Sequence, residues 1–243
     1  MRIAVIADVH ANFIALEAVL AQIATQRVDQ IVCLGDVASL GPQPCETLAR
    51  LQDIRCPIVM GNGEAQLLEP VPLALDALAR IRKIVDIYEW CRMILSDGDR
   101  AFMRSFAPTV TVPLGDDATL LCFHGSPRSY YDVIRVTTPE DELDKMLGDT
   151  TATALAGGHT HQPFIRRYRE RLLFNPGCVG VALMAYRASN LRRAPWAEYA
   201  TVTCENGSLR IELCRTAVDI RAVEAAALQS GMPHADWWAA GTP

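Results

Sequence analysis

Short apolar runs that each end in a polar or glycine-bearing turn recur along this chain. The first three are Arg2–Ala7, Gln30–Leu34 and Pro57–Met60. Between them, Ile14–Ile23 carries its apolar residues on one helical face, and Cys45–Leu51 also favours a helix. Strands that alternate with helices in this way are typical of βαβ units. The pattern therefore predicts an α/β fold with a mainly parallel sheet.

The middle of the chain has a different pattern. Residues 64–108 show no clear strand and carry apolar positions at helical spacing, over Leu73–Ile94 and again over Asp97–Phe106. This spacing predicts a helical insertion. After it, five further strands are expected, at Thr119–Phe123, Ala152–Gly157, Arg171–Phe174, Tyr199–Cys204 and Ser208–Cys214.

The C-terminal part contains two clear local signals. Asn206-Gly207 lies between two strand-like runs, which favours a β-hairpin. Asp219 is suited to cap a final helix that extends to Gln229. Because no repeat and no Pro-, Gly- or Ser-rich linker divides the chain, we expect a single domain over residues 1–243.

Charge and composition narrow the choice of partners. The 243 residues carry a net charge of −5, the wrong sign for a protein that binds duplex nucleic acid by neutralising phosphates. The 8 cysteines form no C-x-x-C pair, which favours free thiols in a reducing cytosol. Every apolar stretch is shorter than the ~20 residues that span a membrane. We therefore expect a cytoplasmic protein that binds neither a membrane nor a specific duplex.

Side chains able to bind metal follow almost every expected strand. They are Asp8, His10, Asp36, Asn62, His124, His159 and His161, and they include all but one of the 5 histidines. Ligand sites in open α/β sheets lie beyond the carboxyl ends of the strands, so these side chains are expected to converge. A structural role explains any one of these histidines, but it explains the whole set poorly. Imidazole, carboxylate and amide ligands suit Mn, Fe, Co, Ni or Zn rather than Ca.

The same residues form five ordered motifs that resemble those of the calcineurin-like metallophosphoesterases. The motifs are Asp8-Val9-His10, Gly35-Asp36, Gly61-Asn62, His124-Gly125-Ser126 and Gly157-Gly158-His159-Thr160-His161. Further stretches resemble the smaller bacterial and archaeal phosphodiesterase branch, namely Gly41–Pro44, His124–Pro127, Asn175–Gly177 and Ala225–Pro233. The resemblance covers essentially the whole chain. It implies a β-sandwich core of two mixed sheets flanked by helices.

The resemblance also implies a dinuclear metal site. Asp8, His10, Asp36 and His161 would hold the first ion, and Asp36 would bridge to a second ion completed by Asn62, His124 and His159. Of these, Asp36, Asn62 and His10 are the expected catalytic residues. Two divalent transition-metal ions, manganese first among Mn, Fe, Ni, Co and Zn, would acidify a shared water, and the resulting bridging hydroxide would attack a phosphoryl group.

One motif departs from the family pattern. The third motif usually reads Gly-Asn-His followed by Asp or Glu, and its histidine assists the leaving group. Here the stretch is Gly61-Asn62-Gly63-Glu64, so that histidine is missing. Two interpretations remain open: a neutral replacement that the turn tolerates, and altered or lost leaving-group chemistry.

Candidate substrate contacts are Asn12, Asn62, Arg128 and Tyr130. Asn12 lies one turn from the first metal motif. Arg128 and Tyr130, with Tyr131, follow the fourth motif, where Arg can bond a phosphate in bidentate fashion and Tyr can stack on a base. A solvated loop without a binding role is an equally good interpretation of these residues.

The leading functional hypothesis is a metal-dependent phosphoesterase that acts on small phosphodiester or nucleotide-like substrates. One alternative is a protein phosphatase of the Ser/Thr type, which the missing histidine disfavours. Another is a metal- or nucleotide-binding scaffold that keeps the fold without turnover. The pair Trp237-Trp238 fits burial against the rest of the chain or in a homodimer.

Overall fold

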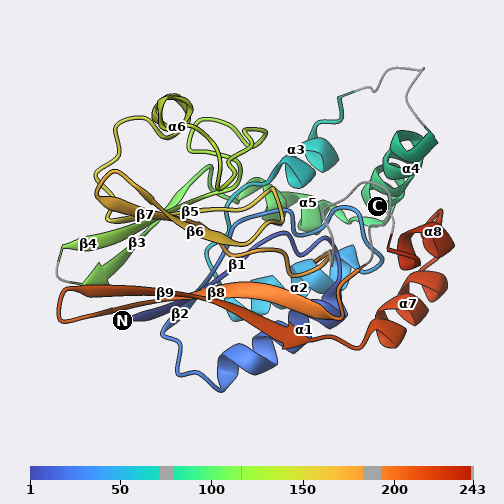
Figure 1. Ribbon diagram of the computed structural model, residues 1–243. Coiled ribbons are helices and arrows are strands. Elements are labelled where there is room, and N and C mark those ends of the chain that lie inside the picture. The colour runs from blue at the N-terminus through green and yellow to red at the C-terminus, as the bar shows by residue number, and fades with distance from the viewer. Residues whose placement is uncertain (72–78, 116, 183–192, 242–243) are drawn as a thin grey trace.

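A computed structural model describes residues 1–71, 79–115, 117–182 and 193–241, and it contains two stacked β-sheets with helices outside them (Figure 1). The first sheet has the order β2-β1-β8-β9. Its strands are β1 (Arg2–Ile6), β2 (Gln30–Cys33), β8 (Trp196–Glu205) and β9 (Ser208–Ala217). Strands β1 and β2 are parallel, whereas β8 is antiparallel to both β1 and β9.

The second sheet has the order β3-β4-β5-β7-β6. Its strands are β3 (Val110–Gly115), β4 (Ala118–Phe123), β5 (Ala154–Gly157), β6 (Phe164–Tyr168) and β7 (Arg171–Asn175). The central strands β4, β5 and β7 are parallel, and both edge strands are antiparallel to their neighbours. Two mixed sheets flanked by helices confirm the fold implied by the family motifs. The single, mainly parallel sheet that the alternation of strands and helices predicted is not what forms, because both sheets contain antiparallel pairs.

Apolar layers join these elements. Ile3 and Val5 of β1 pack between the sheets against residues such as Leu120 of β4. On the outer face of the first sheet, α1 (Phe13–Ala24) and α2 (Pro44–Ile54) bury their apolar sides. Helix α6 (Glu140–Leu147) covers the outer face of the second sheet through Leu143 and Leu147. Helices α7 (Ile220–Gln229) and α8 (Ala235–Ala239) lie at the end of the sandwich.

Within its described residues, the predicted helical insertion contains three helices, α3 (Asn62–Leu68), α4 (Ala79–Ile94) and α5 (Asp97–Arg104). The part of the expected helix at residues 72–78 lies outside the described residues. Asp219 accepts a hydrogen bond from the amide of Ala222 and caps α7, as predicted. Among the described residues, no helix is both long and apolar enough to cross a membrane.

Several predicted elements differ from the structure. The stretch Pro57–Met60 forms only isolated bridges, one from Ile58 to Cys33, because the chain turns into α3 directly after it. Strand β3 was not predicted; it contains Pro113, which an edge strand tolerates. Helices α6 and α8 were not predicted either. The cysteines are all free thiols, as expected, although Cys45, Cys56 and Cys214 are only half-buried.

Candidate metal centre

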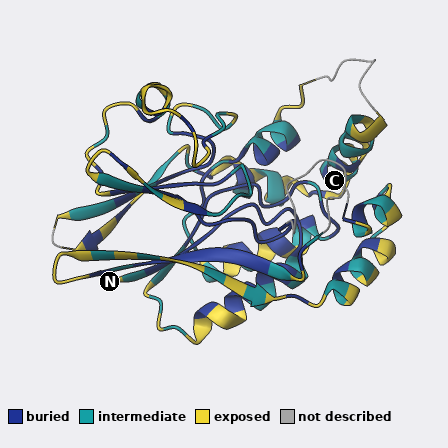
Figure 2. Cartoon of the chain, in the orientation of Figure 1, coloured by how far each residue is buried: buried dark blue, intermediate teal, exposed yellow. Residues whose placement is uncertain are grey.

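The fold brings the predicted ligands together from both sheets. Strands β1 and β2 are a parallel pair in one sheet, and β4 and β5 are a parallel pair in the other. The loop after each strand carries one of the metal-binding motifs. These loops are largely buried between the strand ends and the helices (Figure 2). Parallel strands place their carboxyl ends on one edge, so stacking two such pairs gathers four motifs at one place.

One group of ligand atoms contains Asp8, His10 and His161, whose atoms lie within 4.8 Å of one another. His10 Nε2 is 3.0 Å from His161 Nε2, and His161 Nε2 is 3.4 Å from Asp8 Oδ1. Asp8 and His10 are buried, whereas His161 is partly open. These three are ligands predicted for the first ion.

A second group contains Asp8, Asp36 and His124, again within 4.8 Å. Asp36 lies between the two groups: its Oδ1 is 3.5 Å from His124 Nε2 and its Oδ2 is 3.8 Å from His10 Nε2. Asn62 Oδ1 is 2.9 Å from His124 Nε2. The ring of His159 lies beside that of His124, with centroids 5.1 Å apart. The structure thus gathers all seven predicted ligands.

Backbone carbonyls orient two of the imidazoles. His124 Nδ1 lies 2.8 Å from the Leu34 carbonyl oxygen, and His10 Nδ1 lies 3.3 Å from that of Ser39. A proton on each Nδ1 satisfies these acceptors and leaves the Nε2 lone pairs directed into the cluster, as in metal-binding histidines. His124 Nε2 then faces the oxygen of Asn62, which places two acceptors together. A cation between them would resolve this arrangement.

Electrostatics also suit a cation. Asp8 Oδ1 is buried and has no hydrogen-bond partner among the described residues. Burial opposes its charge, but the imidazoles of His161, His124 and His10 lower the pKa of Asp8 to about 2. Burial and the neighbouring His161 lower the pKa of His10 to about 4. Asp8 is therefore ionised and His10 neutral near pH 7, the forms in which both residues bind metal.

The ligand loops have an unusual backbone. Asp8, His10, Asp36, His159 and His161 all adopt left-handed conformations, with φ between 46° and 67°. Such conformations cost on the order of 1–3 kcal/mol each and cluster at functional sites. Burial of the loops and their hydrogen bonds hold these conformations in place.

Glu64, the last residue of the third motif, is buried and had no predicted role. Its carboxylate accepts hydrogen bonds from the amides of Asp36 (2.9 Å), Val37 (2.7 Å), Ala38 (3.0 Å) and Gly61 (3.2 Å). It therefore fixes the loop that carries Asp36 to the start of α3. The sequence signal for this role was a single carboxylate close behind the predicted ligand Asn62.

Two other residues without a predicted role fix the remaining loops. Asn175 donates to the Gly158 carbonyl (2.7 Å) and to Thr160 Oγ1 (3.1 Å), and so supports the loop that carries His159. Cys178 Sγ donates to the Asp8 carbonyl at 3.0 Å. Scattered cysteines gave no hint of this contact.

The glycine in the third motif has a packing reason. The φ of Gly63 is outside the left-handed region, but a Cβ there would overlap Ser39 Oγ and lie 2.8 Å from Asp36 Oδ1. Ser39 is fully buried. The Gly63 amide donates to Asp36 Oδ1 at 2.6 Å. Close packing by Ser39, rather than turn geometry, therefore explains why no side chain stands here.

The predicted substrate contacts other than Asn62 have these surroundings. Asn12 is buried and caps α1; its Oδ1 accepts from the Ala15 amide and its Nδ2 donates to the Gly180 carbonyl. Arg128 is exposed and forms an ion pair with Asp132 at 2.7 Å. Tyr130 is half-buried. Their roles in substrate binding remain predictions.

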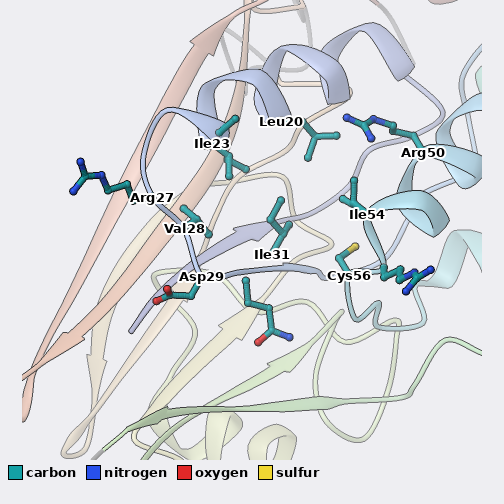
Figure 3. Close-up of a pocket in the computed structure, with 12 residues that line it drawn as sticks. Leu20, Ile23, Arg27, Val28, Asp29, Ile31, Arg50, Ile54 and Cys56 are labelled. Carbon is teal, nitrogen blue, oxygen red and sulfur yellow. The ribbon is translucent and has the colours of Figure 1, made fainter.

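One pocket borders this centre and another lies away from it. A pocket of about 450 Å³ includes Asn62 and Tyr131 in its lining. A second, of about 560 Å³, lies against α1, β2 and the end of α2 (Figure 3). Leu20, Ile23 and Ile31 line its apolar part. The second hollow contains none of the predicted ligands, whereas the first borders Asn62.

Comparisons with known proteins agree with this geometry. A protein of Methanocaldococcus jannaschii described as uncharacterized is 28% identical over 177 residues, which are 72% of this chain and 68% of that protein. A metallophosphoesterase from Sphaerobacter thermophilus has a TM-score of 0.75 and 26% identity, and the match covers 99% of each chain.

A hypothetical protein from Pyrococcus horikoshii OT3 has a TM-score of 0.81 over 100% of this chain and 98% of that chain; at 16% identity, this likeness shows the fold alone. Residues 1–207 match the calcineurin-like phosphoesterase superfamily domain. That match contains every residue of the centre described above, and the chain belongs to the calcineurin-like phosphoesterase superfamily.

Proposed function

We propose that this protein is a phosphodiesterase whose centre holds two divalent transition-metal ions, with manganese as the first candidate. The observation that carries the proposal is the sharing of carboxylates. Asp8 belongs to both groups of ligand atoms, and Asp36 faces His10 with one oxygen and His124 with the other. Two cations close together need such shared anions between them. When bound, they lower the pKa of water and neutralise a phosphoryl group.

The residues of the chain set the charge of this centre. Asp8 and Asp36 bring two negative charges, whereas the imidazoles and Asn62 are neutral ligands. The loaded site therefore stays cationic and attracts a phosphate. Asn62, His159 and His161 are the partly open ligands, so substrate would approach from their side.

The charges around the opening favour a diester over a monoester. Arg128 is paired with Asp132, and Arg92, which lines the pocket beside Asn62, is paired with Glu89 at 3.0 Å. Neither guanidinium is left to balance the second negative charge of a phosphomonoester. A singly charged phosphodiester suits this surrounding better.

The test is a metal titration joined to a substrate panel. The purified protein is loaded in turn with Mn, Fe, Co, Ni and Zn, and hydrolysis of bis-p-nitrophenyl phosphate is compared with that of p-nitrophenyl phosphate. We expect two equivalents of metal and faster hydrolysis of the diester. Two bound equivalents without turnover for any metal would instead indicate the scaffold alternative.

Substitutions test the individual ligands. Asp36→Ala should lose both ions, because its carboxylate is assigned to both. His161→Ala should weaken the first site and His159→Ala the second. His234→Ala is the matched control, since His234 pairs with Asp86 away from the centre. Two retained equivalents in Asp36→Ala would contradict the shared carboxylate.

A further inference from the structure

The pocket of about 450 Å³ beside Asn62, here called the aromatic pocket, is formed by the helical insertion and by the loop after His124. Helix α3 contributes the metal ligand Asn62 at one wall. Its complete lining is Asn62, Gln66, Pro70, Val71, Ile84, Val85, Tyr88, Glu89, Arg92 and Tyr131. A group bound at the metal centre therefore has this pocket as its immediate neighbour.

Most of the aromatic pocket is apolar, and part of that apolar surface is open to water. Ile84, Val85 and Tyr88 come from α4. Val71 is 63% exposed and Tyr131 is 56% exposed, both among the large apolar residues most open to solvent. Large exposed apolar side chains gathered at one concave site are typical of a surface that binds a ligand.

Two pairs of residues in the lining satisfy each other's polar groups, including the two charged side chains. Gln66 and Val71 exchange two hydrogen bonds, of 3.2 and 3.3 Å. Arg92 donates to both carboxylate oxygens of Glu89, at 3.1 and 3.0 Å. The lining therefore carries no net charge and reserves no cation for a second phosphate. It suits an uncharged group.

The ring of Tyr88 packs against the buried core and lines the same pocket as the predicted ligand Asn62. A flat aromatic side chain is thus fixed beside the ligands before any substrate arrives, which lowers the entropy cost of binding.

We propose that the aromatic pocket binds a single planar aromatic substituent of the phosphoester, with Tyr88 and Tyr131 as its specificity-determining side chains. This inference rests on the proposed phosphoesterase function. The phosphoryl group lies at Asn62 and the metal ions, and a nucleobase or an aryl ring fills the pocket. Its volume is large enough for such a group, and its neutrality disfavours polyphosphates and acidic peptides.

Binding measurements on the manganese-loaded protein test this inference. Adenosine 5′-monophosphate is compared with ribose 5-phosphate, which lacks the base, by calorimetric titration. Phosphate release is followed in parallel, so that turnover is not mistaken for binding. Stacking of a base on an aromatic side chain predicts roughly 5- to 150-fold tighter binding of the nucleotide. Phenyl phosphate against methyl phosphate forms the second pair and separates an aryl site from a nucleoside site.

Three variants locate the preference. Tyr131→Ala should lower the ratio between the dissociation constants of the two ligands in each pair to nearly one. Tyr131→Phe should keep the wild-type ratio, because the ring remains. Val136→Ala is the matched control, since Val136 is 52% exposed and lies outside the pocket. Tyr131 is itself largely exposed, so the fold should tolerate each change. Loss of the ratio in Tyr131→Ala without loss of phosphate binding supports the inference.

Equal dissociation constants in both pairs of ligands would overturn it, as would an unchanged ratio in Tyr131→Ala. These results are distinct from failure of the proposed function. A protein that hydrolyses phosphodiesters without preferring aromatic ligands refutes the pocket alone. A protein that prefers them in a Tyr131-dependent way, but shows no turnover with any metal, refutes the phosphodiesterase alone.

Discussion

Replacement of Gly63 by alanine is expected to destabilise the protein, although alanine is the better helix former. Gly63 lies in the first turn of α3, where helix propensity alone would favour Gly63→Ala by up to about 1 kcal/mol. The new Cβ would overlap Ser39 Oγ and lie 2.9 Å from Ser39 Cβ. Overpacking of a buried site costs about 1–3 kcal/mol. Because Ser39 is fully buried and cannot swing away, we expect a net loss of roughly 1–2 kcal/mol.

A double-mutant cycle isolates this contact. Urea unfolding of the metal-free protein gives the free energy of unfolding for wild type, Gly63→Ala, Ser39→Gly and the double variant. Ser39→Gly removes the two crowded Ser39 atoms and leaves only Asp36 Oδ1 close to the new Cβ, so the double variant should be more stable than the two single losses predict, by about 1 kcal/mol or more. Wild-type stability of Gly63→Ala, or additivity within about 0.5 kcal/mol, would refute the packing explanation. The same overlap means that Gly63→His alone cannot restore the missing histidine.

Three further predictions concern a residue beside the centre and two residues elsewhere in the fold. Glu64→Gln should lower the free energy of unfolding by about 2–3 kcal/mol in urea titrations, because its amide group would face backbone donors, and should weaken metal binding roughly 10- to 100-fold in metal titrations. Arg128→Ala should raise the pKa of Asp132, whose pKa the hydrogen bond from Arg128 holds below its usual value; the pair stabilises the fold at neutral pH, and this contribution is lost as the pH falls through the lowered pKa. Carboxyl NMR titration measures the pKa of Asp132 in both proteins, and an unchanged pKa in Arg128→Ala would contradict the pairing. Trp238→Phe should cost about 1–3 kcal/mol of stability in thermal or urea unfolding, because it removes the hydrogen bond from the buried indole to the partly buried carbonyl of Leu40.

The convergence of the candidate ligands could be predicted from the sequence because the relevant signal is local. A polar side chain directly after an apolar strand needs no tertiary information to be noticed. Asp8, Asp36, His124 and His161 all follow strands in this way. The shared edge of parallel strands then gives convergence by geometry alone. The division of the strands into two mixed sheets was predicted from the family motifs. The alternation of strands and helices alone did not indicate it.

The parts that could not be predicted depend on contacts between distant segments. Glu64 is separated from Val37 by 27 positions, and Cys178 from Asp8 by 170. No local pattern indicates that Ser39 occupies the space beside Gly63. Trp238 illustrates the same limit: burial against the chain and burial in a dimer were equally good interpretations, and the structure buries its ring within the chain.

The position of the centre at the seam between the sheets has a consequence for ion selectivity. Asp8, His10 and Asp36 follow strands of the four-stranded sheet, and His124 and His161 follow strands of the other. At this seam a Cβ on Gly158 would lie 3.1 Å from Asp8 Oδ2 and 3.3 Å from Ala7 Cβ, so the two sheets approach each other closely beside the candidate ligands. The distances between donor atoms from the two sheets therefore depend on how closely the sheets pack. A core substitution that moves the sheets apart would also change the spacing offered to an ion, without any change in the ligands themselves.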